Sequence, residues 1–180
     1  RGATIGTGAS GAIRNSWMAF GGRSSEGVLD IITSKTFAVE NNTFARINKY
    51  AVSNRREGTV SIQGNLFRGI GAKSPDGSAI KTDGNLVNPQ IKYNRMADVP
   101  IGIGTGGQSQ PTIQFNNFAG TVTGVRNTDV RRCVSAQRNW WGDSFGPEDR
   151  STTRDSCQLE GNPDGRGVGV SDNVNYLNPL

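Results

Sequence analysis

Apolar residues recur along this chain in a fixed relation to an asparagine. A small or β-branched residue is followed by two variable positions, Asn, one variable position and a large apolar residue. Successive asparagines lie 22 to 29 residues apart. A repeat of this length is typical of a solenoid, in which each unit buries its apolar face against the next unit. The pattern occurs as Ala12-Asn15-Trp17, Val39-Asn42-Phe44, Ile62-Asn65-Phe67, Ile91-Asn94-Met96, Ile113-Asn116-Phe118 and Ala136-Asn139-Trp141.

The pattern predicts a short strand on each side of an asparagine corner. Ile62, for example, points inward between the outward Ser61 and Gln63. The asparagine turns the chain, because its side chain bonds local backbone and tolerates the left-handed conformation. Stacking of the coils then places like residues above like, with an aliphatic stack, an aromatic stack and a ladder of amides. The expected ladder consists of Asn15, Asn42, Asn65, Asn94, Asn116 and Asn139.

The irregular coil length favours one subtype of solenoid. Left-handed β-helices keep a strict hexapeptide period, whereas parallel crossovers in one sheet are by default right-handed. A leucine-rich repeat requires leucines at positions where this chain has none, and a β-sandwich does not explain the fixed asparagine. We therefore expect an all-β, right-handed parallel β-helix of about six to seven coils with a C-terminal capping segment.

Composition supports a thin core and removes several kinds of chemistry. The chain has 25 Gly and 33% hydrophobic residues, yet its Val, Ile and Phe recur at fixed positions, which disordered chains do not show. It has no His, so Ser-His-Asp and Cys-His sites and His-ligated zinc are excluded. The net charge of +5 could favour acidic partners, but the charges are dispersed, so nucleic acid is not an expected partner. No apolar run is long enough to span a membrane.

Two cysteines, Cys133 and Cys157, offer either a disulfide that closes a long loop or two free buried thiols. Two Cys without His are too few ligands for a metal site, and none is predicted. We expect the disulfide, which would place the protein in an oxidising compartment outside the cytoplasm.

The C-terminal segment departs from the repeat and carries a resemblance. It contains an NWWG element at 139–142, Gly146-Pro147, the strand-like series 170–176 and a final Pro179-Leu180. In these features it resembles secreted bacterial and archaeal right-handed β-helix repeat proteins of the pectate-lyase-like superfamily. The resemblance is close over 134–180 and extends over 12–133 by the style of the repeat. It implies the β-helix fold, with coils over 1–138 and a cap over 139–180, and an extracellular or cell-surface location.

The N-terminal residues show no comparable cap. Residues 1–6 already have the pattern of a coil. Since an open solenoid end exposes unpaired strand edges, we expect upstream coils or a partner chain at this end.

Catalytic residues are not evident. The polygalacturonase and mannuronan-epimerase motifs of the superfamily are absent. A polysaccharide lyase remains chemically available, with Lys or Arg as the base and Ca²⁺ as a cofactor neutralising a uronate carboxylate. Its candidate residues, which are equally consistent with a solvated face, are Lys81, Asp83, Lys92 and Arg95.

A second candidate surface comprises outward residues beside the asparagine corner. Stacked Gln and Ser/Thr side chains can hydrogen-bond several sugar hydroxyls at once, and two aromatic residues directly precede the asparagines of adjacent coils. Such residues can also simply solvate a sheet. The candidates for glycan binding are Gln63, Lys92, Gln114, Gln137, Tyr93 and Phe115.

We therefore expect a non-catalytic extracellular β-helix, acting as a structural, adhesive or glycan-binding module whose partner is a polysaccharide or cell-surface glycan. No cofactor is expected for this function. The alternatives are a fragment of a polysaccharide lyase that acts on an acidic polymer, and a segment of a phage or viral fibre.

Overall fold

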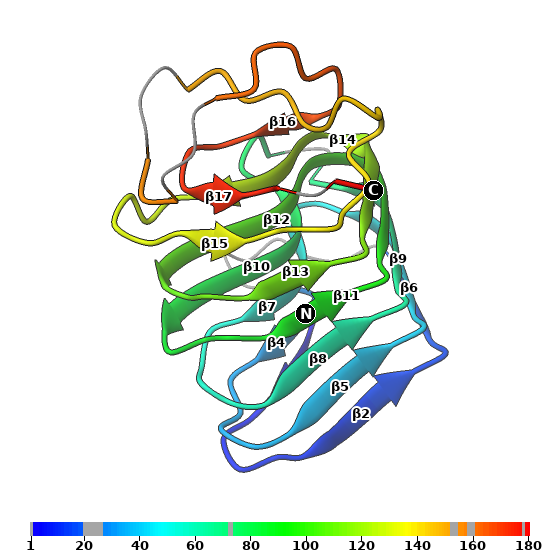
Figure 1. Ribbon diagram of the computed structural model, residues 1–180. Helices are drawn as coiled ribbons and strands as arrows, with labels where there is room; N and C mark the ends of the chain where they lie inside the picture. Colours follow the sequence, from blue (N-terminus) through cyan, green and yellow to red (C-terminus); the bar gives the residue numbers. More distant parts are fainter. Residues whose placement is uncertain (1, 20–26, 72–73, 152–154, 158–160, 178) are drawn as a thin grey trace.

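Short strands and tight corners wind the chain into a right-handed parallel β-helix (Figure 1). This computed structural model describes residues 2–19, 27–71, 74–151, 155–157, 161–177 and 179–180. In Figure 1 the chain crosses the front from left to right, returns behind, and rises one level with each turn. The fold class predicted from the sequence is confirmed, but the helix has about five turns rather than six to seven, because the final segment contributes only short strands.

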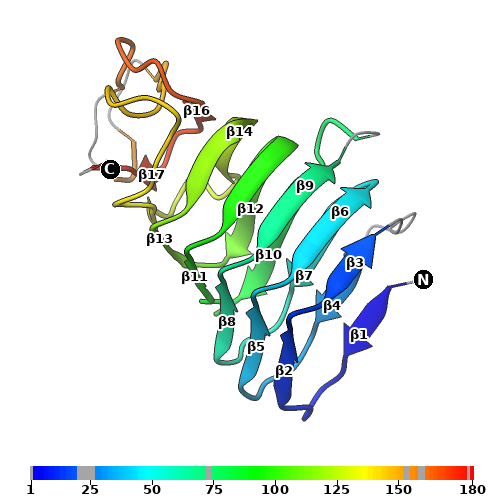
Figure 2. The same cartoon turned by 90° about the vertical axis from the view of Figure 1, so that its right-hand side faces the viewer.

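Three strand-forming faces surround the core. The first face, across the front of Figure 1, is a seven-stranded parallel sheet of β2 (Gly11–Arg14), β5 (Phe37–Glu40), β8 (Val60–Gln63), β11 (Gln90–Lys92), β13 (Thr112–Gln114), β15 (Val134–Ser135) and β17 (Val174–Asn175). The second face, which faces the viewer in Figure 2, comprises β3 (Trp17–Ala19), β6 (Thr43–Ile47), β9 (Leu66–Ile70) and the first parts of β12 (Arg95–Gln108) and β14 (Asn117–Asn127).

The third face comprises β1 (Ala3–Ile5), β4 (Leu29–Ile31), β7 (Tyr50–Asn54), β10 (Ser78–Asn85), the later parts of β12 and β14, and β16 (Gly169–Val170). Because β12 and β14 run without a break from the second face to the third, these two faces belong to one ten-stranded sheet. The two chain termini lie at opposite ends of the stack (Figure 2).

Like residues stack on like inside the helix. Phe44 and Phe67 have ring centroids 5.0 Å apart, and Phe118 and Trp141 are also 5.0 Å apart, with Met96 between the two pairs. The inward aliphatic residues of the first face, Val39, Ile62, Ile91 and Ile113, are fully buried. This alternation of inward and outward residues is the reason that so few apolar residues suffice for the core.

An amide ladder runs along the corner between the first and second faces. The Oδ1 atom of Asn65 accepts hydrogen bonds from the backbone N–H and the side-chain amide of Asn42, at 2.9 and 3.1 Å. The same pair of bonds joins Asn65 to Asn94, Asn94 to Asn116 and Asn116 to Asn139. All five side chains are at most 1% exposed.

Asn15 does not belong to this ladder. Strand β2 pairs with β5 so that Ile13 lies beside Val39, and Ser16, not Asn15, donates its backbone N–H to Asn42. Met18 therefore faces the core, while Trp17 is 75% exposed. The sequence register predicted for this coil is wrong by one residue, which moves every side chain to the opposite face.

The left-handed corner residue is also not the ladder asparagine. The residue that directly precedes each ladder asparagine adopts positive φ. These residues are Asn41 (56°), Gly64 (64°), Tyr93 (56°), Phe115 (57°) and Arg138 (57°). The exposed Asn15, with φ of 50°, occupies the same position in the first coil. The buried amides are thus used for hydrogen bonding between coils, and their neighbours make the turn.

The C-terminal segment lies over the last complete coil. Trp141 is fully buried on Phe118, β16 pairs with β14, and β17 pairs with β15. A disulfide joins Cys133, just before β15, to Cys157 of the covering loop, which confirms that prediction.

Candidate functional site

Outward side chains of the first face form a continuous polar strip. Gln63, Lys92 and Gln114 lie in register on β8, β11 and β13, so their side chains stack along the sheet. Glu40 continues the column toward the N-terminal end, where it pairs with Arg14 at 2.6 Å. The parallel column two residues earlier contains Ser61, Gln90, Thr112 and Ser135.

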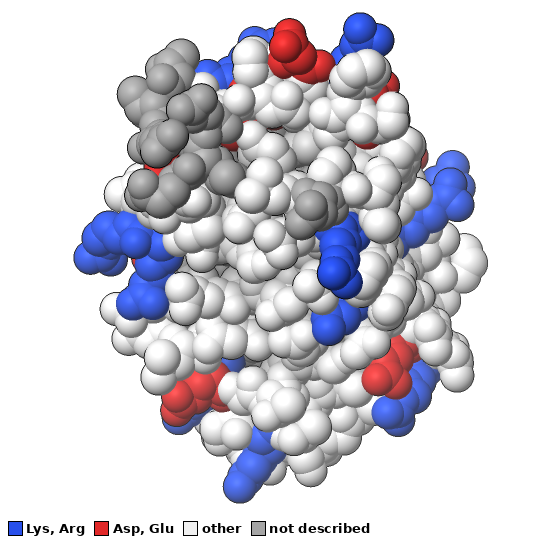
Figure 3. Space-filling model, in the orientation of Figure 1, with Lys and Arg blue, Asp and Glu red and all other residues white. Residues whose placement is uncertain are grey.

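This strip presents hydrogen-bonding groups with little net charge. The Nε2 atom of Gln63 donates to Ser61 Oγ at 2.5 Å, which shows that the two columns are within bonding reach of each other. Figure 3 shows the same side of the molecule as a largely uncharged surface with scattered basic and acidic side chains. Such a surface is suited to a neutral or weakly charged polar ligand that extends along the stack.

Two aromatic rings border the strip at the corner where its strands end. Tyr93 follows Lys92, and Phe115 follows Gln114. Their rings stack with centroids 5.2 Å apart and an interplanar angle of 7°. On its other side Tyr93 neighbours Gly64, which has no side chain, and the tyrosine is 59% exposed.

The conformation of these two residues is costly for the backbone. A bulky residue with positive φ is unusual, and the left-handed conformation costs of order 1–2 kcal/mol per residue. Gly, Asn or Asp would make the turn more easily, as Asn41 and Gly64 do in neighbouring coils. The rings lie outside the core, so core packing does not account for their presence. Strain of this kind at a surface position is grounds for a functional hypothesis.

The structure brings the predicted glycan-binding residues together. Five of them, Gln63, Lys92, Tyr93, Gln114 and Phe115, lie on three adjacent strands and the corner that follows. Gln137 lies one coil further on, where its Nε2 atom donates to Asn175 Oδ1 at 3.3 Å. The first-face strip and the Tyr93–Phe115 stack together form one candidate surface, here called the strip-and-stack surface.

The predicted catalytic residues do not form one site. Lys81 and Asp83 lie on β10 of the third face, with 3.4 Å between Lys81 Nζ and Asp83 Oδ2. Lys92 is on the first face and Arg95 begins the second-face part of β12. Since the four side chains belong to three faces of the helix, they cannot act on one sugar. Within the described residues, no three His, Cys, Asp or Glu side chains gather in a way that could hold a metal ion.

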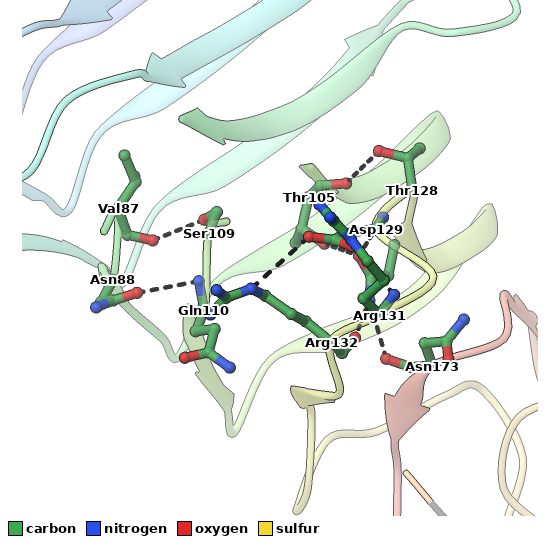
Figure 4. Close-up of polar contacts among 11 residues, drawn as sticks. Val87, Asn88, Thr105, Ser109, Gln110, Thr128, Asp129, Arg131, Arg132 and Asn173 are labelled. Atoms are coloured by element: carbon green, nitrogen blue, oxygen red, sulfur yellow. Dashed lines mark hydrogen bonds and ion pairs between the residues drawn. The ribbon is translucent and has the colours of Figure 1, made fainter. Parts of the chain in front are cut away.

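A cluster of charged residues that the sequence did not single out lies in the loop between β14 and β15 (Figure 4). Asp129 accepts a hydrogen bond from the backbone N–H of Arg131 at 3.0 Å and lies 3.8 Å from Arg132 Nε. The backbone hydrogen bond from Arg131, together with the two guanidinium groups, lowers the pKa of Asp129. Arg132 leads directly into Cys133, so this carboxylate fixes the loop that anchors the cap.

The exposure of another aromatic residue, Trp17, was missed because the register predicted for its coil was wrong. Trp17 lines a groove of about 540 Å³ on the second face, with Leu66, Ala45, Arg68 and Asp98 among its other residues. The one sequence signal for this exposure is that the neighbouring Met18 is also apolar and could fill the inward position in place of Trp17.

Comparisons with known proteins do not assign this chain to a family. No family model matches the chain, and neither the curated proteins nor the solved structures include a match. Among the described residues there is no helix long and apolar enough to cross a membrane.

Proposed function

We propose that this protein is an extracellular β-helix module that binds a glycan chain along the strip-and-stack surface. The observation that carries the proposal is the Tyr93–Phe115 pair, two bulky residues in strained left-handed conformations whose rings are stacked outside the core. Sugar rings present C–H faces that pack on aromatic rings, and their hydroxyls bond to amide and hydroxyl side chains. The stacked Gln and Ser/Thr positions would supply these bonds over several successive coils.

Two further features support an extracellular location. The Cys133–Cys157 disulfide is of the kind that persists in oxidising compartments, and an extracellular location is compatible with it. The C-terminal motif resembles that of secreted β-helix repeat proteins of the pectate-lyase-like superfamily. We place the protein at or outside the cell surface, with a polysaccharide or surface glycan as partner.

Substitution of the aromatic pair by asparagine tests the proposal without disturbing the corner. Asparagine tolerates the left-handed conformation, as Asn41 does at the equivalent position of another coil. We expect the double variant Tyr93→Asn, Phe115→Asn to fold normally and to lose at least about tenfold in affinity, ~1.4 kcal/mol, for glycans identified on an array and measured by calorimetry.

Leu86→Asn provides a matched control. Leu86 is also apolar, exposed and left-handed, but follows β10 at a different corner. Its substitution should leave glycan affinity unchanged. The proposal fails if no glycan binds the wild-type protein or if the double variant binds as tightly as the control. Release of unsaturated sugars from a uronate polymer, detected by ultraviolet absorbance, would instead favour the lyase.

A further inference from the structure

A glycine on the third face lies between two cations. In the paired strands β10, β12 and β14, Gly104 is in register with Lys81 on one side and Arg126 on the other. Two residues later along β10 and β12, Asp83 is in register with Gly106. Because the glycines have no side chains, the outer surface is hollowed along β12 between the side chains of β10 and β14.

Folding does not require glycine at position 104. Its φ lies outside the left-handed region, and a Cβ atom added there would meet nothing closer than Ser78 Oγ at 3.6 Å. Gly102 on the same strand is different, since a Cβ there would lie 2.7 Å from Phe118 and 2.9 Å from Met96 Sδ. Glycine weakens a strand, so Gly104 costs stability without a steric reason. Its effect is to leave the hollow open.

The hollow is a slot of about 240 Å³ with alternating charges on its walls. Lys81 pairs with Asp83 at 3.4 Å and also lies over the ring of Tyr50, 5.1 Å from its centroid. Arg126 pairs with Asp76 at 2.9 Å. Two cations and two carboxylates give the slot no net charge, while offering both donors and acceptors to a ligand.

One polar group in the slot has no hydrogen-bond partner among the described residues. Ser78 lines the slot, is 2% exposed, and its Oγ atom makes no hydrogen bond to any described residue. A buried hydroxyl without a hydrogen-bond partner destabilises the folded state. A hydroxyl-bearing ligand above Gly104 would lie near this atom, because a Cβ atom added at Gly104 would be 3.6 Å from Ser78 Oγ.

We propose that this slot is a second binding site, which takes a single neutral, hydroxyl-rich ring such as one pyranose unit. The balanced charges favour a neutral ligand, and the paired donors and acceptors match the hydroxyls of a sugar. The volume is below the ~300 Å³ of sites for larger ligands, so one ring is accommodated rather than a chain. The site is independent of the strip-and-stack surface, which lies on another face.

Substitution of Gly104 by valine fills the slot from its floor. The test uses amide chemical shifts of the ¹⁵N-labelled full chain during titration with glucose, galactose, mannose and N-acetylglucosamine. We expect at least one of these sugars to shift the amides of Gly104, Gly106 and Thr128 in a saturable manner. Gly104→Val should abolish the response and melt no lower than the wild-type protein, because valine favours a strand.

Gly6→Val is the control, since a Cβ atom at Gly6 would have no neighbour within 4 Å. Gly6 is also far from the slot residues along the chain. The control variant should retain the sugar response. Arg126→Gln is a second variant at an exposed wall residue and should weaken binding at least fivefold. No saturable shift with any of the four sugars overturns the proposal, as does a response that survives in Gly104→Val. A response to glucuronate or inorganic phosphate alone would show an anion site and also overturn it, whatever the result for the strip-and-stack surface.

Discussion

At the scale of single residues, the ladder asparagines link the coils through hydrogen bonds that are donated both to the next coil and to the preceding one. Each Oδ1 atom accepts from the preceding asparagine, and each Nδ2 atom also donates to a backbone carbonyl of the preceding coil, as Asn65 does to Val39 at 2.9 Å. Ser16 begins the series with its backbone N–H. Asn139 ends it by donating to Ile113 and to Ala136 of its own coil. These amides are buried, so each depends on its protein partners.

Removal of one interior ladder amide should therefore destabilise the protein strongly. Asn65→Ala and Asn116→Ala each leave two buried donors of the preceding asparagine without an acceptor, at about 1–3 kcal/mol per unsatisfied group. We expect a loss of at least ~2 kcal/mol in the free energy of unfolding, measured by urea denaturation. Asn85→Ala, at the exposed end of β10, should change it by less than ~0.5 kcal/mol. Equal effects at the buried and exposed positions would contradict the role of the ladder.

At the scale of elements, the sequence predicts a coil well where only one residue can fill each inward position. Ile62 stands between the polar Ser61 and Gln63, and its coil has the predicted register, in which Phe67 rather than the adjacent Leu66 faces the core. In the first coil Ala12 adjoins Ile13 and Trp17 adjoins Met18, so two registers fit the apolar pattern, and the larger aromatic residue suggested the wrong one.

The two candidate surfaces also differ in whether the sequence can predict them. The residues of the strip follow from counting outward positions beside each asparagine, and the sequence predicts their register correctly. The slot on the third face could not be found by counting. Strand β12 is long and its pairing with β14 contains register shifts between Arg95 and Val99, so the alignment of Gly104 with Lys81 and Arg126 requires the structure.

The cap contains a titratable element whose protonation is linked to folding. Tyr176, just after β17, is 7% exposed. Burial raises the pKa of its phenol, and the neighbouring carboxylate of Asp149, which accepts its hydrogen bond, raises the pKa further. A raised pKa in the folded state stabilises the protein fully below the unfolded value of about 10, and this contribution is lost as the pH rises above it.

We therefore expect the free energy of unfolding to fall above about pH 10 by up to ~1.4 kcal/mol per pH unit because of this group. Tyr176→Phe should remove that part of the slope in urea titrations between about pH 9 and 11, although it loses the hydrogen bond at neutral pH. Identical slopes in the variant and the wild-type protein would show that the phenol does not become harder to ionise on folding.

At the scale of the whole molecule, the two ends of the β-helix are built differently. The C-terminal end is covered by Trp141, β16, β17 and the disulfide-linked loop. At the N-terminal end, β1, β2 and β3 each pair with only one strand among the described residues, and the inward Ile13 and Met18 are only partly buried. The stability of a solenoid is close to a sum of terms for each repeat and its interfaces, so a coil with one neighbour is held less firmly than one with two.

This difference should be visible in amide hydrogen exchange of the full chain. The amides of β2 and β3 should exchange at least about tenfold faster than those of β8 and β9, a difference of ~1.4 kcal/mol in opening free energy. Strand β15 at the covered end is the internal control, and we expect its protection to resemble that of β8 rather than β2. Equal protection at both ends at low protein concentration would contradict the nearest-neighbour account. Protection of β2 and β3 that increases with protein concentration would instead show that a second copy covers the open end, which is the arrangement expected of a fibre segment.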